Sequence, residues 1–352
     1  MIIPSTSLIK KLLLVFLIIA GLYVAQSFLI PLCIAVIIAT FFVPFCQWME
    51  SKGIPKAIAV LVCLLLLLIT IAGIGALLTW QVSQLTNDFS LLTQKVNSIG
   101  DTIQKYIFQN FGITAKEQSQ LLNNEQLSIT GTIQKIAGSA VSLLTNFILV
   151  LAYFFLLLYF RTHIGRFILK LFPASQQVEV GKVLSSVTLV SQQYLLGLTK
   201  MIVCLWIMYG IGFSIIGVKN ALFFAILCGL LEIVPFIGNL TGTTLTVLVA
   251  IVQGAGVPLV IAIIGVYMLV QLIQEWILSP VILGSQVKIN AFTVVLALVL
   301  GELIWGIAGI FLAIPLIAMF KIICDHIESL KPYGFLIGEV VSQKRKSPSD
   351  TK

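Results

Sequence analysis

Several apolar runs in this chain are long enough to cross a lipid bilayer as a helix. A spanning helix needs about 20 consecutive apolar residues, and runs of this kind recur from the N-terminal region to the last third of the chain. The composition agrees, because 59% of the residues are hydrophobic and only 10% are charged. Hydrocarbon offers no hydrogen-bond partners, so a spanning segment must satisfy its own backbone groups, as a helix does. The sequence therefore predicts an all-α membrane protein that crosses the bilayer several times.

We expect about eight transmembrane segments, with both termini in the cytoplasm. Basic residues at the ends of the apolar runs, such as Lys10, Lys52 and Arg161, fall on one side if the runs alternate in direction. The net charge of +8 therefore indicates membrane orientation and contact with anionic lipid, and not nucleic-acid binding. The expected segments are 12–30, 31–45, 57–80, 143–160, 201–218, 221–252, 258–283 and 291–320.

A polar stretch from Gln81 to Ser139 separates the third and fourth segments. Apolar residues recur in it at three-four spacing, from Val82 to Tyr106 and again from Ile129 to Leu143. The spacing predicts two amphipathic helices that form an extracytoplasmic hairpin, packed against each other or between subunits; helices lying flat on the headgroups are the alternative. The predicted organisation is three spans (1–80), the hairpin (81–140), a fourth span with a cytoplasmic interfacial helix (141–200), a transport core (201–325) and a cytoplasmic tail (326–352).

Two of the apolar runs are interrupted by residues that disfavour a continuous helix. Proline removes a backbone donor and glycine loosens the helix, and irregular backbone at membrane depth is tolerated where it is buried in protein or lines a watery cavity. Paired breaks are typical of transporter binding sites, although small residues also let helices approach closely. Whether either run spans the bilayer or re-enters stays open. The interruptions are Glu232, Pro235, Gly238, Asn239 and Gly242 in the first run, and Gly301, Glu302, Gly306, Gly309 and Pro315 in the second.

Three glutamates, Glu232, Glu275 and Glu302, lie between residues 220 and 320, where Lys288 is the only basic residue. An unpaired carboxylate in a low dielectric favours its protonated form, so these groups could exchange protons or attract a cation. For Glu275 and Glu302, which have a tryptophan close by, a hydrated position at headgroup depth is the alternative.

Other polar residues accompany these glutamates. Gln271, Glu275 and Ser279 are spaced by four, which predicts that they share one helical face just before Pro280. Thr241 follows the first break, where its hydroxyl could bind a solute or bond to its own helix.

The sequence favours neither an enzyme nor a cofactor-binding protein. Its six cysteines lie within or at the edges of apolar runs, its histidines number two, and no Cys/His cluster offers a metal site. There is no nucleotide-binding motif, and no Ser/His or paired-Asp constellation accompanies the membrane carboxylates. We therefore expect no bound metal and no cofactor, and ATP-driven transport would need a partner chain.

Four segments taken together resemble the autoinducer-2 exporter family. They are QYLLG (193–197), GLLEIVPFIGNLTG (229–242), QLIQEWILSPVILG (271–284) and LGELIWGIAGIFLAIPLIA (300–318). The resemblance covers nearly the whole chain and implies a first break at Pro235 and Gly238, a second segment at Pro280 and Gly284, and a third at Gly306, Gly309 and Pro315. The chain departs from the family at Ile289-Asn290-Ala291, where a proline is expected, and this leaves the local start of the helix open.

The resemblance implies a multi-pass exporter of the bacterial inner membrane that assembles as a homo-oligomer, such as a pentamer. The expected function is secondary export of a small polar solute similar to autoinducer-2, coupled to an ion or proton. A sodium (lithium)/proton antiporter and a non-transporting membrane scaffold are the alternatives. The predicted binding or coupling residues are Glu232, Pro235, Gly238, Asn239, Thr241, Gln271, Glu275, Pro280, Gly284, Glu302, Gly306, Gly309 and Pro315.

Overall fold

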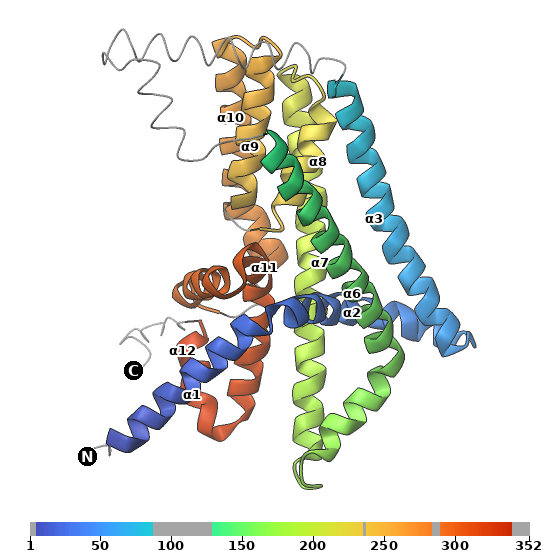
Figure 1. The fold of residues 1–352 in the computed structure, drawn as a ribbon, viewed down its shortest axis with the longest axis vertical. Coiled ribbons are helices and arrows are strands. Elements are labelled where there is room, and N and C mark those ends of the chain that lie inside the picture. Colours follow the sequence, from blue (N-terminus) through green and yellow to red (C-terminus); the bar gives the residue numbers. More distant parts are fainter. Residues whose placement is uncertain (1–4, 87–128, 235–236, 284–288, 340–352) are drawn as a thin grey trace, which may run out of the picture. The chain divides into compact units, whose positions relative to one another are not determined.

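The computed structural model describes residues 5–86, 129–234, 237–283 and 289–339 (Figure 1). Within these residues the regular structure is helical, which confirms the expected all-α fold there. The helices are α1 (Ser5–Val24), α2 (Gln26–Ser51), α3 (Lys56–Thr86), α6 (Ile129–Lys170), α7 (Gln177–Ile215), α8 (Ala221–Leu231), α9 (Ile237–Val252), α10 (Val257–Ile273), a π-helix (Gln274–Leu283), α11 (Ala291–His326), a 3₁₀ helix (Glu328–Leu330) and α12 (Lys331–Ile337).

Among the described residues, six helices are long and apolar enough to cross a membrane. By length and composition they are α2, α3, α6, α7, α10 with its π-helical extension, and α11, although the 36 residues of α11 are divided into two arms at Gly306. The apolar parts of α1, α8 and α9 are shorter. Six of the eight expected segments therefore correspond to helices that are long enough by this measure, whereas the first segment and the run 221–252 do not. The boundary between the first two segments was expected near Pro31, but the break lies at Ala25, and α2 continues through Pro31.

Two helices are longer than the segments expected from the sequence. The expected interfacial helix and fifth span form one helix, α7, of 39 residues, which is about 58 Å long at 1.5 Å per residue. This exceeds the hydrocarbon thickness of about 30 Å, so part of α7 extends beyond the hydrocarbon. The stripe from Ile129 to Leu143 likewise continues directly into the fourth span as α6. Residues 87–128 of the expected hairpin lie outside the described residues.

The contacts within the chain define two compact units. Described residues within 1–44, 156–200 and 277–352 belong to unit 1, and those within 45–155 and 201–276 belong to unit 2. In unit 2, α9 packs against both α8 and α10, and α3 contacts α8. Close helix approach depends on small residues: a Cβ on Gly212 would contact Val266, and one on Gly229 would collide with the Trp206 indole. The indole Nε1 also donates to the Ile226 carbonyl over 3.1 Å.

The interrupted run 221–252 forms a hairpin of two short helices. Gly238 lies against the carbonyl of Leu231, and Gly242 lies against Cys228, so α9 returns along α8 in the opposite direction (Figure 1). The 11 residues of α8 are about 17 Å long, which is too short to cross the hydrocarbon alone. The run is therefore not one membrane-spanning helix.

In unit 1, α11 also doubles back. Gly306 has φ 60° and ψ −141° in the middle of the helix, a conformation that glycine adopts without the penalty of a Cβ. Gly301 and Gly309 consequently lie backbone to backbone, whereas a continuous helix would separate them by about 12 Å. Trp305, in the first arm, donates to the Leu22 carbonyl over 3.0 Å and thereby attaches α1 to this hairpin. Both interrupted runs are thus helical hairpins.

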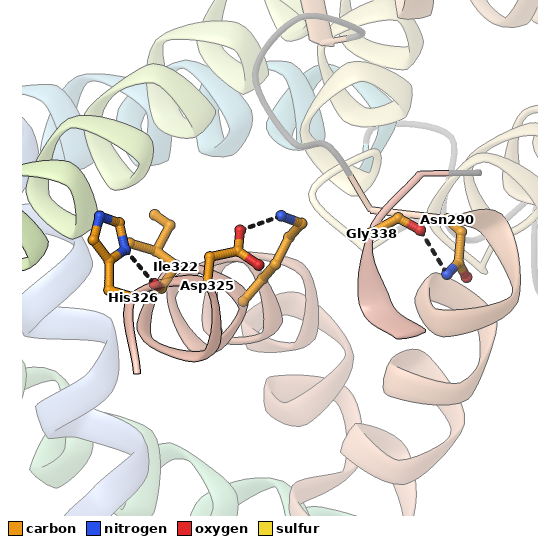
Figure 2. A network of polar contacts seen from close by, with 6 residues as sticks. Asn290, Ile322, Asp325, His326 and Gly338 are labelled. Carbon is orange, nitrogen blue, oxygen red and sulfur yellow. Dashed lines mark hydrogen bonds and ion pairs between the residues drawn. The ribbon is translucent and has the colours of Figure 1, made fainter. Parts of the chain in front are cut away.

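Asn290 determines where α11 begins, at the position where the sequence left the helix start open. Its Oδ1 accepts a hydrogen bond from the Thr293 amide over 2.8 Å, which is an N-cap. Its Nδ2 donates to the carbonyls of Leu336 (2.5 Å) and Gly338 (3.0 Å) at the end of α12; Figure 2 shows the bond to Gly338. A cap residue therefore replaces the expected proline and fastens the C-terminal helix to α11.

Candidate functional site

The turn between α8 and α9 is the point at which the first hairpin carries its polar groups. Glu232 is the C-cap of α8. The next two amides bond to carbonyls three residues back, from Ile233 to Leu230 and from Val234 to Leu231. The Gly238 amide then bonds to the Val234 carbonyl over 2.9 Å. A Cβ on Gly238 would overlap the Leu231 carbonyl, so a larger residue would force the two helices apart. The hairpin thus places a carboxylate at its tip.

The Glu232 carboxylate is held by a chain of two amide side chains from α10 and the π-helix that follows it. Gln271 Nε2 donates to Gln274 Oε1 over 3.3 Å, and Gln274 Nε2 donates to Glu232 Oε1 over 2.5 Å. Gln274 is 5% exposed. Because both amides donate in the direction of the carboxylate, the chain of hydrogen bonds is oriented toward Glu232.

The buried oxygens without a hydrogen-bond partner among the described residues include Glu232 Oε2, Asn239 Oδ1 and Thr243 Oγ1. Asn239 and Thr243 are 3% and 6% exposed and lie four residues apart on α9, so they share a face. Buried polar groups are nearly always hydrogen-bonded in folded proteins. These oxygens could accept hydrogen bonds from the hydroxyl or amine groups of a polar solute, or coordinate a cation.

Gln274 and Thr243 belong to this cluster but are not among the residues predicted from the sequence. The four-residue spacing of Gln271 and Glu275 predicted that both side chains share a face, but a π-helix begins at Gln274 and widens the turn. Pro280 explains the wider turn, since it cannot donate an α-helical bond. As a result Gln274 is buried and contacts Glu232, whereas Glu275 is exposed. The sequence signal that could have identified Gln274 was its position three residues after Gln271, about one helical turn away.

The other predicted residues are distributed between the two units. In unit 2, Gly238 and Asn239 belong to the buried hairpin tip, and Thr241 is exposed. In unit 1, Gly309 and Pro315 are buried in the α11 hairpin, Gly306 forms its turn, and Pro280 and Glu302 are exposed. Pro235 and Gly284 lie outside the described residues. The structure therefore places Glu232 and Asn239 in the α8–α9 hairpin and links Gln271 of α10 to Glu232 through Gln274. Gly306, Gly309 and Pro315 lie in the α11 hairpin of unit 1.

Known proteins with similar sequences are named as transport proteins. Residues 12–329 match the AI-2E family transporter description. The candidate transport protein MT0215 of Mycobacterium tuberculosis is 28% identical over 86% of this chain and 84% of its own length. YrrI of Bacillus subtilis, also named as a candidate transport protein, is 25% identical over 86% and 87%. The AI-2 transport protein TqsA of Escherichia coli is 22% identical over 92% and 93%. The chain, with its spanning helices and two broken hairpins, is a multi-pass membrane protein that belongs to the AI-2E family of transporters, and it is not an enzyme.

Proposed function

We propose that this chain is a secondary transporter of the bacterial inner membrane that exports a small polar solute of the autoinducer-2 type, with Glu232 coupling the movement to an ion or proton. One observation carries the proposal: a carboxylate at the tip of a broken hairpin has one oxygen bound by Gln274 and the other buried without a partner among the described residues. Such a group can take up a proton, a cation or a hydrogen-bond donor of a solute.

The similarity to TqsA, whose name records AI-2 transport, supports the choice of solute. The buried oxygens of Asn239 and Thr243 support it as well, because a polyhydroxylated solute offers several donors to such acceptors. Broken helices that return near the middle of the membrane are the usual way in which secondary transporters surround a solute. We further propose that the protein works as a homo-oligomer, in line with the family.

Efflux from proteoliposomes tests the proposal. The purified protein is reconstituted with the autoinducer-2 precursor and a pH dye inside, and external sodium is varied. Solute loss accompanied by a pH change supports the exporter. A sodium-driven pH change without solute loss replaces it by a sodium/proton antiporter, for which the same oxygens would bind the cation. No response of either kind contradicts the proposal and favours the scaffold.

Glu232→Gln identifies the coupling group in the same assay. Glutamine retains the shape of the side chain and an oxygen that accepts the Gln274 bond, but it cannot bind or release a proton. We expect the pH change to disappear while the protein remains folded. Glu339→Gln removes one carboxylate from an exposed position near the C-terminal end and serves as the matched control, which should behave as the unmodified protein.

A further inference from the structure

Unit 1 contains a cavity that none of the predicted site residues lines. The cavity has a volume of 530 Å³ and lies between the end of α6, the start of α7 and the end of α11 with the 3₁₀ helix that follows. Binding sites for small molecules usually have volumes of about 300–1,000 Å³. Its size is therefore suitable for an organic ligand and exceeds the space of a packing defect.

The inner part of this cavity is apolar. Ile168 of α6, Val183, Leu184 and Val187 of α7, and Ile323 of α11 line it. The apolar face of α7 lines the cavity from Val180 to Val187 and becomes buried farther along the helix, at Ser191 and Tyr194. From Glu179 to Val187 the helix rises about 12 Å, which gives the approximate length available to an apolar ligand.

The polar lining residues lie at the helix ends. Gln176 lies just before α7 and Glu179 in its first turn. His326 ends α11, and Glu328 lies just beyond it. The cavity therefore changes from apolar to polar along the helices, as expected for a ligand with an apolar body and one polar head.

The charge of this polar end is negative. Two of its lining residues are glutamates, and no lysine or arginine is found among the described residues that line the cavity. Glu179 has no ion-pair partner in the described part of the chain, while the exposed Glu328 carboxylate lies 3.9 Å from the Lys331 ammonium, so the polar end keeps a net negative charge. His326 Nδ1 lies 2.8 Å from the Ile322 carbonyl (Figure 2). Because a carbonyl only accepts, Nδ1 carries the proton, and a neutral ring has its free acceptor at Nε2.

We propose that this cavity binds an amphipathic organic cation, with its apolar body between α6, α7 and α11 and its ammonium group at Glu179 and Glu328. The site goes beyond the proposed export function, because it uses none of the residues assigned to the transported solute. Apolar burial supplies the affinity, at about 0.8 kcal/mol per methylene, and the carboxylates select the sign of the charge.

Three probes with the same eight-carbon chain test the charge preference: octyltrimethylammonium, octanol and octanesulfonate. Each is titrated calorimetrically, below its micelle concentration, into the full-length protein in phosphatidylcholine nanodiscs. We expect octyltrimethylammonium to bind about tenfold more tightly than octanol and octanesulfonate to bind most weakly, since each exposed carboxylate contributes a factor of about three. Equal binding of octanol, or tighter binding of octanesulfonate, would overturn the proposal.

Variants distinguish binding of the probes in the cavity from their partitioning into the surrounding lipid. Val183→Trp fills the apolar part and should weaken all three probes at least tenfold; unchanged binding would mean that the probes enter the bilayer, and the proposal fails. Val187→Phe repeats this test in case Val183→Trp does not fold, as judged by size exclusion. Glu179→Gln with Glu328→Gln should weaken only the cation, about tenfold, and a preserved preference for the cation refutes the assignment. Glu339→Gln, outside the cavity lining, should leave binding unchanged.

Discussion

Gln274 Nε2 donates to Glu232 Oε1 over 2.5 Å, although the two residues lie 42 positions apart. The bond joins the tip of the α8–α9 hairpin to the first turn of the π-helix that follows α10. Through Gln271, which donates to Gln274, the carboxylate is held by a directed chain of amides. In a low dielectric, charge-assisted bonds are stronger than neutral ones. A change in the protonation of the Glu232 carboxylate would therefore change the strength of the bond that positions the hairpin tip.

Gln274→Leu should impair transport more than it impairs folding. Leucine has a similar size but removes the amide that donates to Glu232 Oε1, and leaving a buried acceptor unpaired costs about 1–3 kcal/mol. We expect efflux to fall about tenfold or more and the unfolding temperature to fall by a few degrees. Gln193→Leu, at a half-buried glutamine of α7 in unit 1, is the control. Wild-type efflux in Gln274→Leu would show that Gln274 does not position Glu232.

The ends of the α8–α9 hairpin should be accessible from the same side of the membrane. Lys219 lies just before α8 and Gln253 just after α9, and neither helix is long enough to cross about 30 Å of hydrocarbon. In a variant without native cysteines, Lys219→Cys and Gln253→Cys should react with an impermeant maleimide in vesicles of the same orientation. Labelling of the two cysteines from opposite sides would show that the run crosses the bilayer.

Gly301→Ala and Gly309→Ala should each destabilise the α11 hairpin. A Cβ at either position overlaps the backbone of the other, so the two arms must move apart, at a cost of about 1–3 kcal/mol or more. Gly73→Ala and Gly75→Ala on α3 are matched controls because a Cβ there meets nothing within 4 Å, and alanine favours a helix by about 1 kcal/mol. Thermal unfolding of the purified variants should separate the two pairs clearly. If all four behaved alike, the contact between the arms would have no part in stability.

Substitutions of Asn290 should separate its two roles. Asn290→Asp keeps an oxygen to cap α11 but removes the donor to the Leu336 and Gly338 carbonyls, whereas Asn290→Ala removes both. Loss of an N-cap costs about 1 kcal/mol. By hydrogen–deuterium exchange, we expect α12 to exchange faster in both variants and the first turn of α11 to exchange faster only in Asn290→Ala. Unchanged exchange of α12 in Asn290→Asp would mean that other contacts hold that helix.

The sequence by itself determined that the protein is helical and lies in the membrane. The length of the apolar runs sets these properties, because hydrocarbon leaves the backbone no partner outside its own helix. Glycine, proline and glutamate in the middle of Ala221–Val252 and around Gly306 also located both breaks, since each residue type disfavours a continuous apolar helix for a local reason.

Only the tertiary structure decided what the breaks become and which polar groups meet. That α8 and α9 fold back on each other depends on the close fit of Gly238 to Leu231 and of Gly242 to Cys228, contacts between separate helices that no periodicity records. Gln274, and not Glu275, contacts Glu232 because a π-helical turn begins there and rotates the following side chains. The cavity between α6, α7 and α11 likewise requires three segments distant in the chain. Local pattern fixes where a helix can form, whereas side-chain packing between helices fixes which faces meet.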